Sequence, residues 1–214
     1  MKTLIVTIFD RKLFSESVEM FDKFEKFFAE LGPDVTCVNV DAKSSMITQI
    51  KNHGSKPDFV MFYCCCRGAT YRYICMDQAI QIENSKVYPL SALQYTAVEG
   101  DLNVPILVIA ECGRELCYGY GNKLKLTHKH LFRCFTAKER GNICVSNDKF
   151  QKILYDKLKN FTSKSIMGMW NDLKECERDV GNDYSLNYDH SYNIFHDENK
   201  MKVIDDCFVK LFKK

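Results

Sequence analysis

The chain has 214 residues, of which 46% are hydrophobic and 27% are charged, and its formal net charge is +2. This length and composition are sufficient for one sizeable hydrophobic core and favour a single domain. The small net charge argues against the strongly basic surface that nucleic-acid binding requires, so we expect no nucleic-acid partner. The sequence contains no run of about 18 apolar residues, so we also expect no membrane-spanning helix.

The chain contains 11 cysteines, three of them consecutive at positions 64, 65 and 66. The first residues lead directly into an apolar run that is too short for the core of a secretion signal, and no cleavage site follows it. We therefore expect a cytoplasmic protein whose thiols stay reduced. No Cys-x-x-Cys pair occurs, so the sequence predicts no metal site and no cofactor, and most of the cysteines are expected to fill the core.

Strands and helices are predicted to alternate along the chain. Apolar runs, typical of strands buried on both faces, cover residues 3–9, 59–66 and 104–110, and two further strands are predicted over residues 35–40 and 130–137. Helices are predicted over residues 15–31, 44–52, 90–99, 149–161 and 165–180. The polar stretch 181–200 is predicted to be a loop, and residues 203–212 are apolar enough for a final strand or helix. Such alternation predicts an α/β fold with a mostly parallel sheet.

Two predicted strands end in residues that suit a functional site. Residues 59–66 lead into Arg67 and Gly68, and residues 104–110 lead into Glu111 and Cys112. In open α/β sheets the ligand crevice lies beyond the carboxyl ends of the strands. A cysteine at such an end, with backbone N–H groups beside it, has the ingredients of a nucleophile and an oxyanion hole. The alternative is that Cys112 is one more packed cysteine.

These two segments resemble caspases. Residues 104–115, VPILVIAECGRE, resemble the caspase strand that ends in the nucleophilic cysteine, and residues 58–68, DFVMFYCCCRG, are similar to the strand that ends in His-Gly. Cys112 follows Arg67 at close to the roughly 50 residues expected in that family. The resemblance implies a three-layer caspase-like sandwich, with a mostly parallel six-stranded sheet and helices on both faces. It also implies a single domain, in which residues 1–125 resemble the large-subunit part and 126–214 the small-subunit part.

The resemblance also implies the residues of the site. Cys112 stands in the place of the nucleophile, Arg67 stands where the family has its general-base histidine, and the backbone N–H of Gly68 is expected to serve an oxyanion pocket. A guanidinium beside a thiol favours the thiolate, but it stays protonated at any relevant pH and cannot give a proton to the leaving amine. Since loss of general acid–base catalysis costs on the order of 10²–10⁴ in rate, we expect little or no peptide hydrolysis.

Other histidine and arginine residues could contribute to the same site. His53 and Gly54 form a His-Gly pair, but they precede the third predicted strand and are expected at the opposite end of the sheet from Cys112, as a helix terminus. Arg11 and Arg140 lie in the segments where a pocket for an acidic residue would need arginines. For both arginines the interpretation as a surface residue is favoured.

The sequence leaves three functions open. The first is a caspase-like pseudoenzyme that regulates cell death or protease signalling by pairing with, or mimicking, an active caspase-like protein. The resemblance implies that it pairs with such a protein or with itself through a C-terminal edge strand, residues 203–212. The second is an active cysteine endopeptidase that uses Cys112 with an altered base. The third is a non-enzymatic, doubly wound α/β binding module, although no glycine-rich phosphate loop follows the first strand.

Overall fold

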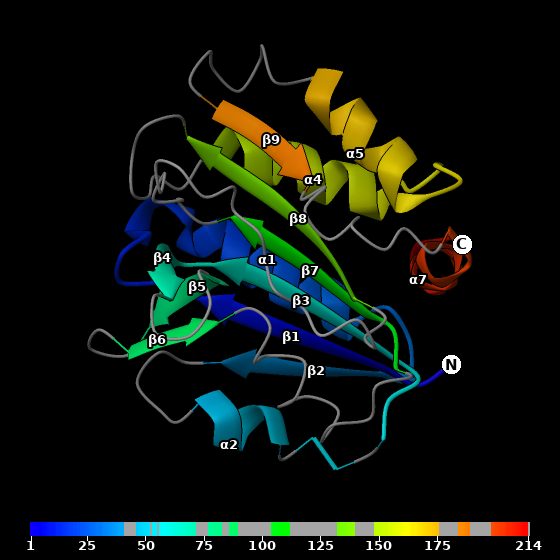
Figure 1. Ribbon diagram of the computed structural model, residues 1–214, viewed down its shortest axis with the longest axis horizontal. Coiled ribbons are helices and arrows are strands. Elements are labelled where there is room, and N and C mark those ends of the chain that lie inside the picture. Colours follow the sequence, from blue (N-terminus) through cyan, green and yellow to red (C-terminus); the bar gives the residue numbers. More distant parts are fainter. Residues whose placement is uncertain are drawn as a thin grey trace.

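A six-stranded sheet forms the centre of the structure, a computed structural model that describes residues 1–40, 46–51, 53–54, 56–71, 77–82, 86–89, 104–111, 132–139, 148–175, 184–188 and 198–213. The strand order is β2-β1-β3-β7-β8-β9 (Figure 1). The strands are β1 (Thr3–Phe9), β2 (Val35–Val40), β3 (Phe59–Cys65), β7 (Ile106–Glu111), β8 (Phe132–Glu139) and β9 (Tyr184–Tyr188). Neighbouring strands are parallel except for β9, which runs antiparallel to β8.

Helices cover both faces of this sheet. Every residue of β1, β3 and β7 is buried, as continuous apolar strands require. On one face Tyr63 and Cys65 belong to a core cluster with side chains of α1 (Val18–Ala29), α4 (Asp148–Lys159), α5 (Ile166–Glu175) and α7 (Glu198–Phe212). On the other face Phe62 and Cys64 pack in a cluster that includes Ile50 of α2 (Met46–Lys51).

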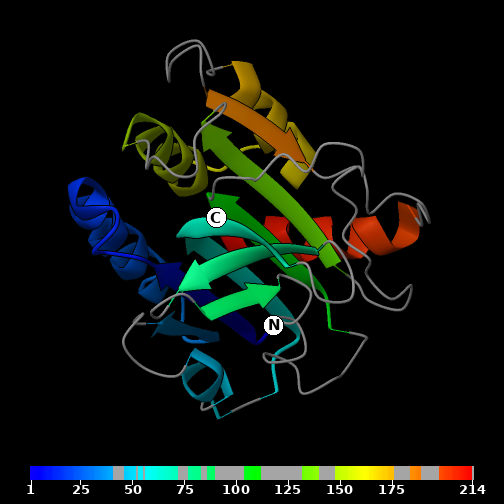
Figure 2. The same cartoon turned by 60° about the vertical axis from the view of Figure 1, so that its left-hand side comes forward.

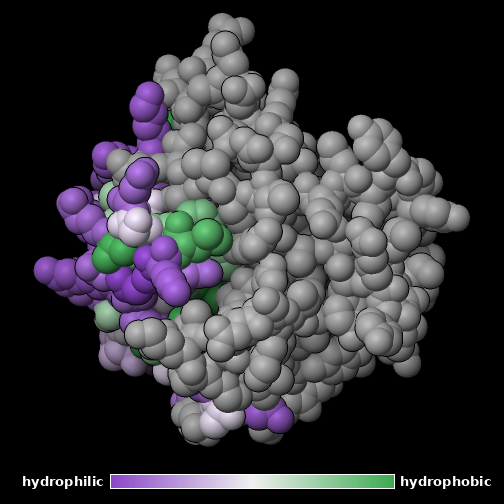
Figure 3. All heavy atoms as spheres, turned by 90° about the vertical axis from the view of Figure 1, so that its left-hand side faces the viewer, coloured by the Kyte–Doolittle hydropathy of each residue, from purple (hydrophilic) through white to green (hydrophobic). Residues whose placement is uncertain are grey.

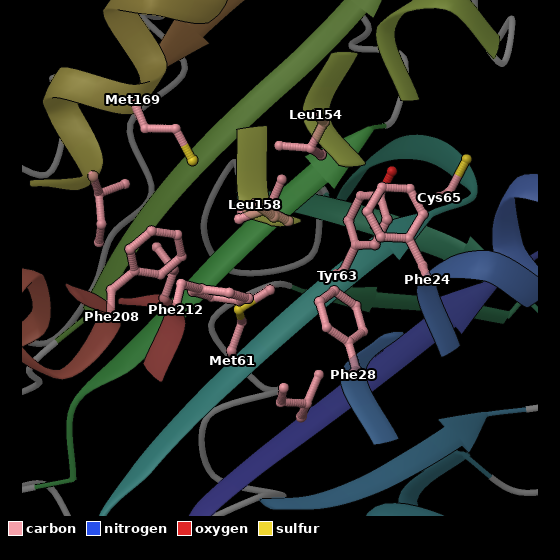
Figure 4. Close-up of a cluster of buried hydrophobic side chains, with 14 of the residues drawn as sticks. Phe24, Phe28, Met61, Tyr63, Cys65, Leu154, Leu158, Met169, Phe208 and Phe212 are labelled. Carbon is pink, nitrogen blue, oxygen red and sulfur yellow. The ribbon is translucent and has the colours of Figure 1, made fainter. Parts of the chain in front are cut away.

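Aromatic side chains from distant parts of the chain meet over β3. Figure 4 shows Tyr63 of β3 close to Phe24 and Phe28 of α1, with α4 above them and Phe208 and Phe212 of α7 to one side. The rings of Phe24 and Tyr63 lie edge to face, with centroids 4.8 Å apart. The N-terminal and C-terminal parts of the chain therefore share one core.

A second, smaller sheet follows β3 directly. It contains β4 (Arg67–Tyr71), β5 (Asp77–Ile82) and β6 (Lys86–Pro89), paired antiparallel in that order. In Figures 1 and 2 this sheet stands beside the carboxyl ends of the central strands. It therefore lies at the end of the molecule where the sequence places the candidate site.

The structure corrects the predicted C-terminal part. Residues 203–212 belong to α7, so the closing strand predicted there is wrong. Ile204, Phe208 and Phe212 are buried at a spacing of one helical turn, whereas Val203 is 42% exposed. The closing strand of the sheet is β9 instead, which lies within the stretch 181–200 predicted as a loop.

Most of the other predicted elements are confirmed within a few residues. The strands at 3–9 and 35–40 are β1 and β2, and the helices at 149–161 and 165–180 are α4 and α5. The predicted helix at 90–99 lies outside the described residues. Among the residues that are described, no helix is long and apolar enough to cross a membrane.

Candidate functional site

The carboxyl ends of three adjacent strands are bonded to one another. Cys65 of β3 is in register with Glu111 of β7, and the Cys66 N–H donates to the Glu111 carbonyl oxygen over 3.4 Å. The Asp10 N–H, just after β1, donates to the Cys65 carbonyl oxygen over 2.9 Å. We call Asp10, Cys65, Cys66 and Glu111 the rim. The strand order reverses between β1 and β3, so a ligand crevice is expected at this end of the sheet.

The surface around the rim is mainly polar where it is described. Figure 3 looks onto this end of the molecule and shows hydrophilic side chains around a small hydrophobic patch. After β1 the chain turns sharply, because an Asp10 side-chain oxygen accepts the Leu13 N–H over 2.9 Å. Leu13 is 46% exposed and, with Val203, is one of the large hydrophobic side chains exposed within the described ranges.

The predicted site residues begin where the rim ends. Arg67 is the first residue of β4, directly after Cys66, and Gly68 is the second, opposite Ile80 of β5. Cys112 is joined in sequence to Glu111 but lies outside the described residues, as do Arg140 and the side chain of Arg67. The structure thus brings together the strand ends that lead into Arg67 and Cys112, and it does not describe the distance between the two side chains.

The three consecutive cysteines at the end of β3 and just after it are core residues. Cys64, Cys65 and Cys66 are all 0% exposed, and Cys65 lies on the opposite face of the sheet from the other two. The run therefore alternates between the two faces, and its three thiols do not converge on one metal ion. Within the described part of the chain, no group of three or more histidine, cysteine or acidic side chains could hold a metal.

A buried polar network lies beneath the rim. The Glu111 side chain is 3% exposed, and its carboxylate accepts a hydrogen bond from Gln151 Nε2 of α4 at 2.9 Å and from the Tyr63 hydroxyl at 3.4 Å. Gln151 Nε2 also donates to Cys65 Sγ over 3.5 Å. Burial, together with the negative charge of Glu111, raises the pKa of Tyr63 well above its ordinary value. The Tyr63 hydroxyl therefore stays a hydrogen-bond donor to Glu111 at neutral pH.

Two acidic residues of α1 form ion pairs with the Arg11 guanidinium. Its Nη1 lies 2.7 Å from Asp22 Oδ1 and its Nη2 lies 2.8 Å from Glu25 Oε2, while its side chain is 38% exposed. The guanidinium also lies 6.0 Å from the centre of the Phe21 ring. These contacts support the interpretation of Arg11 as a surface residue rather than part of a pocket for an acidic residue.

His53 lies at the other end of the sheet, as predicted. It lines a cavity of about 150 Å³ together with Lys2, Thr3 and Asp34, which stand at the amino ends of β1 and β2. Gly54 has a φ angle of 77°, the left-handed conformation typical of a residue just beyond a helix end. This His-Gly pair follows α2, whose last residue is Lys51, and does not belong to the rim.

Solved structures resemble this fold over most of the chain. Protein GSU0716 from Geobacter sulfurreducens matches with a TM-score of 0.55 and 15% identity, over 88% of this chain and 93% of that chain. The structure of pro-Sf-caspase-1 matches with a TM-score of 0.52 and 14% identity, over 81% of this chain and 78% of that chain. Caspase-1 from Spodoptera frugiperda has a TM-score of 0.49 and 15% identity, over 82% and 76% of the two chains.

No family model and no curated protein matches the sequence. The structural likeness to pro-Sf-caspase-1 shows that the chain has a caspase-like fold, as the sequence resemblance implied. At these levels of identity the likeness speaks for the fold alone.

Proposed function

We propose that this chain is a caspase-like pseudoenzyme that regulates cell death or protease signalling by pairing with an active caspase-like chain or by mimicking one. The main support for this proposal is the position of Arg67, which begins β4 directly after the rim. The Cys66 N–H is bonded to the carbonyl of Glu111, and the next peptide bond leads to Cys112. Arg67 follows Cys66 and Cys112 follows Glu111, and the backbone hydrogen bond between Cys66 and Glu111 joins these two strand ends. This supports placing Arg67 and Cys112 in one crevice.

Arginine at this place changes the chemistry of the site. A cysteine peptidase needs a partner that favours the thiolate and later gives a proton to the leaving amine, and histidine does both because its pKa lies near neutral. The guanidinium of Arg67 would supply the first effect and not the second. Backbone N–H groups at Gly68 and Cys112 would still bind a peptide carbonyl oxygen, because backbone donors do not depend on the replaced side chain. Such a site binds a peptide without cleaving it at a useful rate.

Fluorogenic peptides and a peptide alkylator test this proposal. We expect no turnover by the natural chain or by Arg67→Lys, which keeps the cation. Arg67→His is expected to raise hydrolysis by about 10² or more, because it supplies general acid–base catalysis. Cys112→Ala in the Arg67→His background should remove that gain. Rapid hydrolysis and rapid labelling of Cys112 in the natural chain would favour the alternative, an active endopeptidase with an altered base.

Alkylators with different terminal residues test which side chain the binding pocket prefers. Arg11 is held by Asp22 and Glu25, so an acid-specific pocket would lack the charge of this arginine. We therefore expect an alkylator with a terminal Asp to label the Arg67→His variant no faster than one with Arg or Lys. A strong preference for Asp would show that another cation lines the pocket.

Pairing is proposed to use β9 in place of the segment 203–212. β9 ends the sheet, and among the described strands it pairs with β8, so its outer backbone groups are available to a second strand. Ile204, Phe208 and Phe212 of α7, in contrast, pack inward against the core.

Hydrogen exchange tests this pairing. It is measured at low and at high protein concentration, and again after an active caspase-like chain is added. We expect new protection of the amides of residues 184–188 and unchanged exchange in α7. Protection confined to α7, or protection nowhere at concentrations where sedimentation shows a complex, would refute pairing through β9.

A further inference from the structure

A groove lies between α4 and α5, near the turn, residues 160–165, that joins the two helices. The helices pack against each other through Phe150 and Trp170, whose ring centres lie 6.3 Å apart with the rings edge to face (Figure 1). The groove has a volume of about 330 Å³, which is within the size range of ligand pockets. Two apolar and six polar residues line it, and all of them belong to the described part of the chain.

The apolar part of the lining comes from one residue of each helix. Met169 of α5 is buried and Ile153 of α4 is partly buried, and both also pack in the main core. An aliphatic stem that lies along them would remove apolar surface from water on both sides of the contact. The groove therefore suits a side chain that is apolar along its length and polar at its end.

The polar part of the lining carries an excess of negative charge. Asp172 of α5 faces Lys157 of α4, with 3.9 Å between Asp172 Oδ2 and Lys157 Nζ, and its Oδ2 also accepts a hydrogen bond from Ser163 Oγ at 3.3 Å. Asp156 of α4 is exposed, and among the described residues no ion pair involves its carboxylate. The groove thus holds two carboxylates against one ammonium group, so one negative charge is left for an incoming cation.

The hydrogen-bonding groups of the groove favour a donor over an acceptor. Its carboxylates only accept hydrogen bonds, and the hydroxyl and amide groups beside them can do either. The start of a helix often attracts an anion, but two of the first N–H groups of α5 are already bonded. The Ile166 N–H donates to Asp205 Oδ1 over 3.0 Å. The Gly168 N–H donates to Ser165 Oγ over 3.0 Å. A guanidinium, which is permanently charged and carries five N–H donors in one plane, fits this lining better than an anion does.

We propose that the groove between α4 and α5 binds an arginine side chain of a partner protein. The aliphatic stem of this arginine lies along Ile153 and Met169, and its guanidinium binds the carboxylates of Asp156 and Asp172. Charge complementarity supports this occupant, because the guanidinium compensates the carboxylate that no described cation pairs with. An apolar side chain of the same length would gain less, since it would cover the carboxylates without bonding to them.

Peptide titrations followed by the NMR shifts of backbone amides test the role of charge. The probe is acetyl-Gly-Arg-Gly-amide, and its control carries citrulline, which has nearly the same shape as arginine and no charge. We expect the arginine peptide to shift amides within residues 153–172 and to bind about fivefold or more tightly than the citrulline peptide, because charge-assisted hydrogen bonds are the stronger ones. The difference should shrink between about 0.15 M and about 1 M salt, since salt screens partly exposed charges.

Asp156→Asn removes one carboxylate from the groove and keeps the shape of the side chain. We expect the affinity for the arginine peptide to fall about threefold to tenfold and the affinity for the citrulline peptide to change by less than about twofold. Glu16→Gln is the matched control, because it removes the same charge from an exposed position between β1 and α1, and it should change neither affinity by more than about twofold. Both variants should keep the melting temperature of the natural chain, since both residues are exposed.

Equal affinities for the two peptides, an unchanged affinity in Asp156→Asn, or shifts centred outside residues 153–172 would each overturn the inference. The absence of any shift at about 10 mM peptide would overturn it as well. The groove is separate from the rim, because Gln151 near the start of α4 reaches the rim and Asp156 lies more than one helical turn further along. The inference therefore goes beyond the proposed function, and none of these outcomes depends on Arg67 or Cys112.

Discussion

Phe208→Ala tests whether residues 203–212 stabilise the fold as α7. The Phe208 side chain is 0% exposed, and its ring centre lies 5.4 Å from that of Phe161 and 4.7 Å from that of Phe212. Truncating a buried Phe to Ala costs about 3–5 kcal/mol. We expect about 3 kcal/mol, because a terminal helix can shift and close part of the cavity. For a chain of this length that loss corresponds to a fall of about 10 °C in melting temperature.

Urea unfolding followed by far-UV circular dichroism measures the loss, and coincident fluorescence transitions would justify a two-state analysis. Val203→Ala is the matched control on the same helix, since Val203 is 42% exposed and its truncation should change stability by less than about 0.5 kcal/mol. A cost below about 1 kcal/mol for Phe208→Ala, or equal costs for both variants, would refute the packing of α7 into the core.

The Cys37 thiol is expected to resist alkylation until strongly alkaline pH, because burial and the negative charge of Glu25 raise its pKa from 9.0 to about 11. The folded state then holds this proton more tightly than the unfolded chain, so the associated stability is full below about pH 9 and is lost as the pH rises towards 11; comparison of the natural chain with Cys37→Ser in urea at several pH values measures this. Asp205→Ala is expected to cost about 1 kcal/mol, because Asp205 Oδ1 accepts the N–H of Ile166, the first residue of α5, at 3.0 Å. Asp206→Ala, an exposed neighbour, is the control, and equal losses in urea unfolding would contradict this role.

The sequence was most informative where one element is buried on all sides. β3 and β7 were predictable because continuous apolar runs leave no polar face. α7 was ambiguous because partly buried Cys207 and Val209 lie between the core residues, which blurs the helical period of Ile204 and Phe208. β9 alternates Tyr184, Leu186 and Tyr188 with polar Ser185 and Asn187, the period of a half-buried strand, but it is only five residues long within a polar stretch, and its pairing with β8 depends on the packing around it.

Local sequence patterns predicted the candidate site less completely than they predicted the fold. Strand alternation puts Glu111 on the face of Ile109 and opposite that of Ala110, and its contact with Tyr63 agrees with this. No pattern in the sequence points to Gln151, which lies 40 residues further along the chain and reaches the rim only because α4 packs over β3 and β7. A polar contact of this kind depends on tertiary packing and has no local period to reveal it.

Peptide turnover at the proposed site should depend on the residue at position 67. A proton donor must come within hydrogen-bond reach of the leaving amine. Glu111 could carry a proton, but its carboxylate is 3% exposed and faces Gln151 of α4, so it cannot replace the histidine that the Arg67 position lacks. A base at position 67 is therefore the change expected to restore hydrolysis, with Glu111 left in place. Alkylation requires only a thiolate, so labelling of a cysteine is by itself no evidence of peptidase activity in this chain.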